Sequence, residues 1–528
     1  MRARESQRFD RIGGDAGFCL LLFSMTLLVT WQRAHYDWWL SRHDIMTQYL
    51  QWYTYLGQRL RDFQIPAWNP YLNGGAPFAG DAQSGWMMLT AMATFPFLHA
   101  SAAFKAMVGL ELFIGGFSTY ALARALKIGP AGAALAAVIF EFGPFLHYTT
   151  ACCTVRANVA PWIPFSLLGI ELAAASATHR GRMLPLFLAG FGMSQMYVGF
   201  FGQGAVDGLL VVAAYIAYRT LLASPRPMLA WRARVFEMVE LGLGSLALSL
   251  ALGAAGLFPR LDVIGDMEVS LGYNKVGGYT ARPPGLNSFF ASLIGDSPNA
   301  RALAVGGVAF VLFFIGIARA RGRFAVSFFA VMTVVTFTLS LGDTPLHRLF
   351  YLIPRFRDLH EHFPQQATAV VWVGPANIAG AAVESLRTVR RSRSTYASLC
   401  APFIGLLALK IALRYAGLGT GKTSLLAGAA ATVLILIIVT AERGDIWRGI
   451  ARLAPAGLVL VAFILPTGAE MIGMANLLPI DGAWRDAYSS TAKIQKAVDI
   501  AVSSHVPGSA SEFIQQQLAA GEHFRYIP

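Results

Sequence analysis

The chain has 528 residues, of which 55% are hydrophobic and only 13% are charged. A soluble domain usually carries about twice that charged fraction, so the composition excludes an ordinary soluble protein. The formal net charge is +13, but the basic residues stand in short clusters between apolar runs. That arrangement is typical of membrane topology signals and argues against a nucleic-acid-binding face.

Apolar runs of roughly 20 residues, enough to cross a bilayer, recur along the whole chain. The first run is not followed by a small-residue cleavage site, so we interpret it as a retained span and not as a signal peptide. The sequence predicts an all-α integral membrane protein. Hydropathy and flanking charge predict about thirteen spans, at 16–32, 101–123, 131–150, 159–177, 184–200, 204–221, 236–257, 302–318, 324–341, 367–385, 396–413, 423–441 and 453–472.

The basic residues also predict the orientation. With the N-terminus in the cytoplasm, every inner connection carries at least two Lys or Arg, whereas the outer face spreads similar numbers over far more chain. Residues 1–472 then form the transmembrane domain, and 473–528 are an extracytoplasmic segment that we expect to be the truncated start of a larger outer domain. The long outer loops are the first (about 33–100), the second (about 258–300) and the third (about 342–366).

The first outer loop begins with a predicted helix. Apolar residues recur there at three- and four-residue spacing, at Ile45, Tyr49, Trp52, Leu56, Leu60 and Phe63. Such a helix beside a span is expected to lie flat at the membrane surface. Asp44 stands at its beginning, where an aspartate is either an N-cap or a catalytic carboxylate. The later apolar stretch 86–99 is short, and we predict a re-entrant or interfacial helix for it.

A turn-rich stretch, IPAWNPYLNGGAPFAGDAQSG, follows the helix. Its prolines keep the backbone extended or turning, and its paired glycines permit positive φ. Asp81 either caps the next helix or joins Asp44 in a site. Carboxylate, amide and aromatic groups together suit a sugar, which offers C–H faces and many hydroxyls. The candidate substrate-binding residues are Gln48, Trp68, Asn69 and Gln83.

The motifs of this loop carry a resemblance. They are Asp44 with Gln48, Pro66-x-Trp68-Asn69-Pro70, Gly74-Gly75-x-Pro77 and Asp81-x-Gln83-Ser84. Their order over about 44–85 resembles the first outer loop of bacterial YfhO-type membrane proteins, of the GT-C superfamily of multi-pass glycosyltransferases. The resemblance implies that Asp44 is catalytic and Asp81 a second site residue. It also implies a sugar donor on a polyprenyl phosphate, inversion at the sugar, and a location in the bacterial cytoplasmic membrane.

The third outer loop concentrates positive charge. Arg355, Arg357 and His360 are candidates to bind the phosphate of the donor, which is the leaving group and develops charge. The alternative is that these residues contact lipid headgroups and take no part in catalysis. YfhO-type chains carry a Pro-x-Phe-x-x-x-Arg pattern here, and this chain has His360 at the arginine position. A histidine there would make a phosphate clamp sensitive to pH.

Together, these residues and the resemblance predict an inverting glycosyltransferase in which Asp44 is the general base. Its partners would be a polyprenyl-phosphate sugar and an envelope glycan, polymer or lipid as acceptor. No cofactor is required and no metal site is predicted, because His360-x-His362 lacks a third ligand and the four cysteines form no ligand spacing. The paired acidic residues still leave room for a divalent metal.

Carboxylates inside the predicted spans favour another reading. Glu111, Glu141 and Glu171 are costly in a membrane and are typical of a proton-coupled protein, so the alternative is a lipid-linked glycan transporter or flippase. They are equally compatible with pairing to buried polar groups or with lining the donor cavity. A third reading is a non-catalytic assembly partner of another envelope enzyme.

Overall fold

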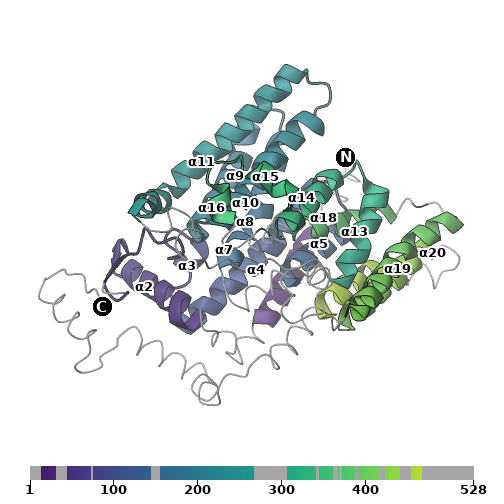
Figure 1. Ribbon diagram of the computed structural model, residues 1–528, viewed down its shortest axis with the longest axis horizontal. Coiled ribbons are helices and arrows are strands. Elements are labelled where there is room, and N and C mark those ends of the chain that lie inside the picture. The colour runs from purple at the N-terminus through teal and green to yellow at the C-terminus, as the bar shows by residue number, and fades with distance from the viewer. Residues whose placement is uncertain are drawn as a thin grey trace, which may run out of the picture.

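The structure, a computed structural model, is almost entirely helical (Figure 1). Within the part of the chain that it describes, the sheet it forms is a two-stranded hairpin in the first outer loop. Asp44, the segment 473–528 and most of the second outer loop lie outside the described residues. The described residues are 14–30, 45–72, 75–143, 155–266, 306–340, 344–360, 367, 372–386, 389, 392–416, 422–440 and 453–465.

Each predicted span overlaps a helix among the described residues, and the prediction of an all-α membrane protein is confirmed. Among the described residues, five helical stretches are long and apolar enough to cross a membrane. Three of them are the helices α4 (Ala100–Ala125), α11 (Trp231–Asp266) and α19 (Arg393–Tyr415). The other two are Ala157–Ala175, which contains α8 (Trp162–Ala175), and Gly204–Leu222, which is formed by α10 (Gln203–Ala217) and η2 (Tyr218–Leu222). Shorter apolar helices are Gly14–Thr30, α5 (Pro130–Phe142), α13 (Gly307–Ala320), α14 (Val326–Leu339), α20 (Thr423–Thr440) and Leu453–Leu465. The helices α9 (His179–Gly199) and α18 (Val373–Leu386) fill the remaining two positions.

One group of helices surrounds α18, which is buried along almost its whole length. It packs against α5, α13 and α14. A Cβ on Gly132 would lie 2.4 Å from the carbonyl oxygen of Gly380, and a Cβ on Gly380 would lie 2.5 Å from that of Gly132. Small residues at such a crossing let two helix backbones approach closely, which is the usual way helices pack inside a membrane.

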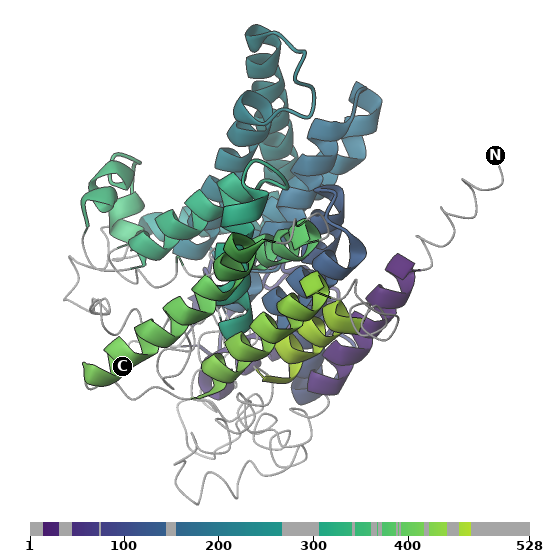
Figure 2. The same cartoon turned by 90° about the vertical axis from the view of Figure 1, so that its right-hand side faces the viewer.

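A second group consists of α8, α9, α10 and α11. The pair α9 and α11 is long and extends away from the rest of the bundle, as both views show (Figures 1 and 2). Helix α4 joins the two groups because it packs against both α5 and α8. Helices α19 and α20 pack against each other and against α13, at the side of the bundle away from α11 (Figure 1).

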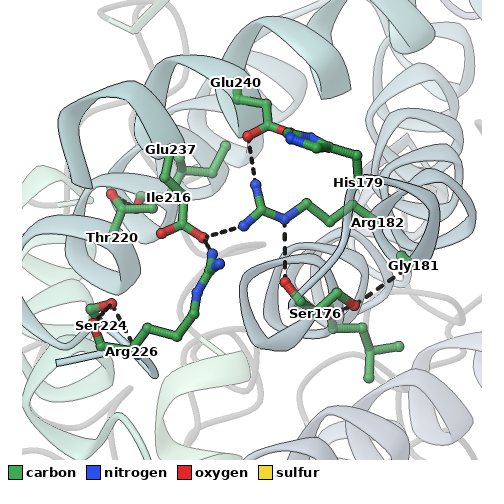
Figure 3. A network of polar contacts seen from close by, with 11 residues as sticks. Ser176, His179, Gly181, Arg182, Ile216, Thr220, Ser224, Arg226, Glu237 and Glu240 are labelled. Carbon is green, nitrogen blue, oxygen red and sulfur yellow. Dashed lines mark hydrogen bonds and ion pairs between the residues drawn. The ribbon is translucent and has the colours of Figure 1, made fainter. Parts of the chain in front are cut away.

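The bundle end that we predict to be cytoplasmic is held by ion pairs between helix ends. Arg182 at the start of α9 binds Glu237 at 3.1 Å and also binds Glu240, both on α11 (Figure 3). Arg226 also binds Glu237, and His179 lies 2.8 Å from Glu240. The Arg182 and Glu237 side chains are buried, so each charge is compensated where water is excluded. This cluster fixes α9 against α11 at one end.

The stretch 86–99 differs from its prediction as a single helix. Only α3 (Leu89–Met92) is helical, and turns flank it. Gly85 has a φ of +74°, and Pro96 cannot donate to a helical ladder, so the backbone turns on both sides of α3. The turn after α3 packs against the helix α2 (Leu50–Arg61), where a Cβ on Gly57 would lie 2.4 Å from the carbonyl oxygen of Phe95.

We expect Gly57→Ala to destabilise the protein, because the added methyl group meets main-chain atoms of Phe95 that cannot move aside cheaply. The expected cost is about 1 to 3 kcal/mol, as for other overpacked sites. Gly242→Ala, in a helix position with nothing within 4 Å, is the matched control and should be neutral or slightly stabilising. Thermal unfolding of purified protein in detergent measures both, and equal melting temperatures for the two variants would contradict this packing.

Candidate active site

The described part of the first outer loop starts with a continuous helix. A wide turn, η1 (Ile45–Tyr49), leads directly into α2. Ile45, Tyr49 and Leu56 are buried, and α2 packs against α3 and α4. The predicted helix is therefore confirmed, and much of its apolar face is covered by the protein itself. Asp44 is the residue before η1 and lies outside the described residues.

Tyr53 fixes α2 to the helical bundle. Its ring is fully buried and lies 5.5 Å from that of Phe95 and 6.4 Å from that of Phe104. Its phenol oxygen accepts a hydrogen bond of 3.0 Å from the side-chain amide of Asn158, which also donates to the carbonyl of Gly199. Burial raises the pKa of Tyr53, so the phenol stays protonated. These contacts set the position of α2 relative to α7 (Val155–Val159) and the end of α9.

The tryptophan motif forms a short hairpin of β1 (Trp68–Asn69) and β2 (Ala76–Pro77). Asn69 is buried, and its Oδ1 accepts a hydrogen bond of 3.0 Å from the amide of Tyr71, so it helps to form the turn. The indole of Trp68 lies over Gly75, where a Cβ would come 2.6 Å from the ring and where φ is +116°. Only glycine fits there, while Trp68 itself remains 37% exposed.

The turn after the hairpin carries Asp81. Its Oδ1 accepts a hydrogen bond of 2.7 Å from the amide of Gln83, and its carbonyl accepts one from the hydroxyl of Ser84. Burial raises the pKa of Asp81, although the Gln83 amide and the nearby Arg260 guanidinium act in the opposite direction. The carboxyl group is half-buried. It therefore protonates more readily than an aspartate in water.

Gln83 joins this turn to the start of the helix. Its Oε1 accepts a hydrogen bond of 2.9 Å from Nε2 of Gln48 and one of 3.0 Å from the hydroxyl of Tyr49. The structure thus brings Gln48, which lies on the helical turn η1, together with Gln83 and Asp81 of the turn after the hairpin. Trp68 and Asn69 lie in the hairpin that precedes Asp81, and Asn69 is used in folding that hairpin.

Three contacts hold this turn against the outer ends of the bundle helices. The indole of Trp86 donates to the carbonyl of Ala255 on α11 at 2.9 Å. The side-chain oxygen of Gln195 on α9 accepts from the amide of Leu89 at 2.8 Å. The amide of Phe201, just before α10, donates to the carbonyl of Ala82 at 3.0 Å. The roles of Trp86 and Gln195 in holding the turn could not be predicted from the sequence, because each bonds to a main-chain group far away in the chain.

The second outer loop contributes Arg260, on the part of α11 that the structure describes. Its side chain is buried beside Asp81. An arginine near the end of an apolar helix raises the free energy of the folded protein unless its N–H groups are hydrogen-bonded. Its presence at such a position is the feature of the sequence that could have identified Arg260.

The third outer loop forms two short helices, α15 (Pro345–Phe350) and α16 (Phe356–His360). Arg355 lies between them and has a φ of +65°. Its side chain is 61% exposed, and its Nε lies 3.6 Å from Oδ2 of Asp358. The guanidinium of Arg357 lies over the ring of Tyr351, 5.5 Å from its centroid. Both arginines are near the surface, where a phosphate group can reach them.

His360 has a different environment. Its Nε2 donates to the carbonyl of Leu339 at 2.9 Å, and Nε2 of His347 donates to the same carbonyl at 3.1 Å. The amide of Thr344 donates to Nδ1 of His347, which places the His347 proton on Nε2. Burial and the neighbouring His347 lower the pKa of His360 to about 4. His360 is therefore uncharged at neutral pH and supplies no positive charge to a phosphate.

The first and third outer loops meet at the same end of α10. Phe356 packs in a cluster with Leu339 and with Val206 and Leu210 of α10. The first outer loop reaches the same helix through the bond between Phe201 and Ala82. The two arginines and the Asp81 turn therefore lie on the same end of the bundle.

The carboxylates within the spans each have a polar partner. Glu171 accepts two hydrogen bonds of 2.6 Å from Arg219 and one from Tyr215. Glu111 accepts from the hydroxyl of Thr90 at 3.1 Å, and Glu141 is bonded to the hydroxyl of Thr26. Their arrangement matches the expectation that they pair with buried polar groups. In the part of the chain that the structure covers, no group of three His, Cys, Asp or Glu side chains is placed to hold a metal ion.

Neither a protein-family model nor a curated protein matches this chain. Among solved structures, ArnT from Cupriavidus metallidurans bound to undecaprenyl phosphate is 14% identical, with a TM-score of 0.47 over 87% of this chain and 78% of ArnT. Its apo form is 16% identical, with a TM-score of 0.48 over 86% and 77%. Arabinosyltransferase EmbB from Mycobacterium smegmatis is 15% identical, with a TM-score of 0.39 over 94% of this chain and 42% of EmbB. Values this low assign no activity or ligand to this chain.

We expect the protein to lose stability as the pH falls from about 6.5 towards about 4, because the unfolded chain then binds a proton at His360 that the folded chain does not. This contribution is complete above the ordinary histidine pKa and is lost as the pH approaches the lowered one. In His360→Asn, whose amide can still donate to Leu339, the dependence on pH should weaken, by at most about 3 kcal/mol across this window.

Melting temperatures across the same pH range measure this effect. His99→Asn, at an exposed histidine before α4, is the control and should keep the wild-type slope. A wild-type slope in His360→Asn would show that His360 is not the group that titrates.

Proposed function

We propose that this protein is a membrane glycosyltransferase that moves a sugar from a polyprenyl-phosphate donor to a cell-envelope acceptor on the outer face of the cytoplasmic membrane. One observation carries the proposal. Gln48, Tyr49 and Gln83 form a hydrogen-bonded set beside Asp81, within the segment that resembles the first outer loop of YfhO-type proteins. Gln48 and Tyr49 of that set lie on η1, the helical turn that follows Asp44 in the sequence.

In the proposed reaction, Asp44 is the general base. It removes the proton from an acceptor hydroxyl as the oxygen attacks the anomeric carbon, and the lipid phosphate leaves with the electrons of the broken bond. Attack opposite the leaving group inverts the configuration at that carbon. General base catalysis of this kind contributes roughly two to four powers of ten. Positioning of the two substrates supplies much of the rest.

The Asp81 turn would hold the sugar. One oxygen of Asp81 is already oriented by the Gln83 amide, which gives the carboxyl group a fixed direction. The side-chain oxygen of Gln83 already accepts hydrogen bonds from Gln48 and Tyr49. The side-chain nitrogen, Nε2, is therefore the atom of Gln83 that can donate to a sugar hydroxyl. The indole face of Trp68 suits the C–H face of a sugar ring.

Arg355 and Arg357 would bind the phosphate of the donor. Guanidinium groups recognise phosphate with two parallel hydrogen bonds, and they stabilise the charge that develops as the phosphate leaves. His360 is uncharged at neutral pH, so in this proposal it shapes the loop and the two arginines carry the charge. Against the transporter alternative, Glu171 is paired with Arg219, and Glu111 and Glu141 each have a hydroxyl partner inside the bundle.

We expect Asp44→Asn to lower the turnover of sugar transfer by on the order of a hundredfold or more, because the amide cannot accept the acceptor proton. The measurement is transfer of a labelled sugar from a synthetic polyprenyl-phosphate donor by purified protein in liposomes. Asp62→Asn, at the exposed end of α2 in the same loop, is the matched control and should keep wild-type turnover. Full activity in Asp44→Asn would remove this residue from the mechanism.

Arg357→Ala should weaken use of the donor by about tenfold, the change that corresponds to losing roughly one charge-assisted hydrogen bond. Use of the acceptor should change much less, because the acceptor brings no phosphate to this loop. Donor and acceptor concentrations are varied separately to measure each. Arg348→Ala, in the neighbouring helix α15, serves as the control for a general loss of surface charge. Unchanged donor kinetics in Arg357→Ala would contradict the phosphate-binding role.

A further inference from the structure

Arg260 makes four hydrogen bonds to main-chain carbonyls. Its side chain is only 1% exposed. Its Nε donates to Asp81 at 3.1 Å, and its Nη1 donates to Gly256 at 2.8 Å. Its Nη2 donates to Trp86 at 3.2 Å and to Val198 at 2.9 Å.

These carbonyls belong to three separate parts of the chain. Gly256 is on α11, one turn before Arg260, and Val198 is at the end of α9. Asp81 and Trp86 are the two ends of the turn that carries Gln83. A guanidinium group has donors in a rigid planar fork, and four of them are used here. A lysine could replace the charge but not this geometry.

The turn has little room to sit elsewhere. A Cβ on Gly80 would lie 2.3 Å from Cγ2 of Val263 and 2.8 Å from the carbonyl oxygen of Pro259, so the backbone before Asp81 rests directly on α11. A Cβ on Gly256 would lie 2.8 Å from Nη1 of Arg260. Because both positions are glycine, the turn can pack directly on α11 and the Arg260 side chain still has room between them.

The bond from Arg260 to Asp81 goes to the carbonyl and leaves the carboxylate to other partners. The carboxylate is instead oriented by the Gln83 amide. The arginine therefore fixes the backbone that carries the acid and acts on the carboxylate through its charge alone. A direct ion pair would have tied up the carboxylate oxygens that the proposed sugar contact needs.

We infer that Arg260 is a positioning residue, which holds the turn 81–86 against α9 and α11 and places a fixed positive charge beside Asp81. The part that concerns sugar transfer rests on the proposed function, whereas the docking of the turn does not. Lost docking should expose the amides of the turn, and lost charge should make Asp81 protonate at higher pH.

The experiment compares three substitutions in liposome-embedded protein. Arg260→Gln removes both the fork and the charge, and Arg260→Lys keeps the charge but loses the fork. Arg234→Gln is the matched control, because Arg234 also donates to three carbonyls, those of Leu229, Leu221 and Pro227, at the other end of α11.

Hydrogen exchange of the peptide covering 78–89, followed by mass spectrometry, reports the docking. In Arg260→Gln and Arg260→Lys we expect exchange of these amides to become faster by on the order of tenfold or more, since bonds to a charged donor are lost. Arg234→Gln should leave this peptide at the wild-type rate. Unchanged exchange in both Arg260 variants would overturn the docking role.

Labelling of Asp81 by a carbodiimide and an amine, followed across pH, reports the charge, because the protonated carboxyl is the reactive form. The exposed Asp62 is the internal reference for the chemistry. Both substitutions weaken the docking, so the comparison between them isolates the charge, and the labelling midpoint of Asp81 should lie at higher pH in Arg260→Gln than in Arg260→Lys. Equal midpoints in the two variants would overturn the electrostatic role.

A further variant covers the case in which Arg260→Gln fails to fold. Trp86→Phe removes the bond to Ala255 from the same turn without changing any charge. It should speed exchange of 78–89 without moving the labelling midpoint to higher pH, whereas a midpoint at higher pH would show that mobility alone has this effect and would overturn the role of the charge. Sugar transfer is then assayed with the same proteins. Absence of transfer in the wild type would refute the proposed function and leave both readouts of Arg260 valid.

Discussion

A polar loop can rest on an apolar helical bundle only where its buried main-chain groups find partners, and this requirement determines how the first outer loop sits. The turn between Asp81 and Leu89 offers several carbonyls and amides to the outer ends of α9, α10 and α11. Arg260, Gln195 and the main-chain amide of Phe201 satisfy them. The indole of Trp86, on the turn itself, donates in the other direction to the carbonyl of Ala255 on α11. A main-chain group buried there without a partner would cost several kcal/mol, so the turn can dock only in a position that pairs these groups.

Buried charged side chains have different kinds of partner at the two ends of the bundle. At the end we predict to be cytoplasmic, arginine and glutamate side chains pair with one another across short connections, as in the cluster of Arg182, Glu237 and Glu240. At the opposite end the buried arginine bonds only to main-chain carbonyls. Among the residues that the structure describes, the carboxylate of Asp81 therefore makes no ion pair, and in the proposed function it stays available to a sugar hydroxyl.

Much of this arrangement could be predicted from the sequence. The positions of the helices follow from the apolar runs, because a helix that faces lipid must be apolar, although helices such as α5 and α14 are shorter than the predicted spans. Gln48 and Gln83 were both named as candidate substrate-binding residues, and the structure joins them by a hydrogen bond. The role of Arg260 could not be predicted, since it depends on carbonyls 62 and 179 residues away in the chain. His360 was expected to bring charge to a phosphate, but burial beside His347 keeps it neutral.

The central claim is that the turn at Asp81 forms part of the binding site for a lipid-linked sugar. Photocrosslinking tests it most directly, with a polyprenyl-phosphate sugar that carries a photoreactive group on the sugar, in liposomes containing the protein. The account predicts that the crosslink maps to the peptide covering 78–89 and disappears when unlabelled donor is added in excess. Crosslinks confined to the surface of α19 and α20, or unaffected by excess donor, would contradict it.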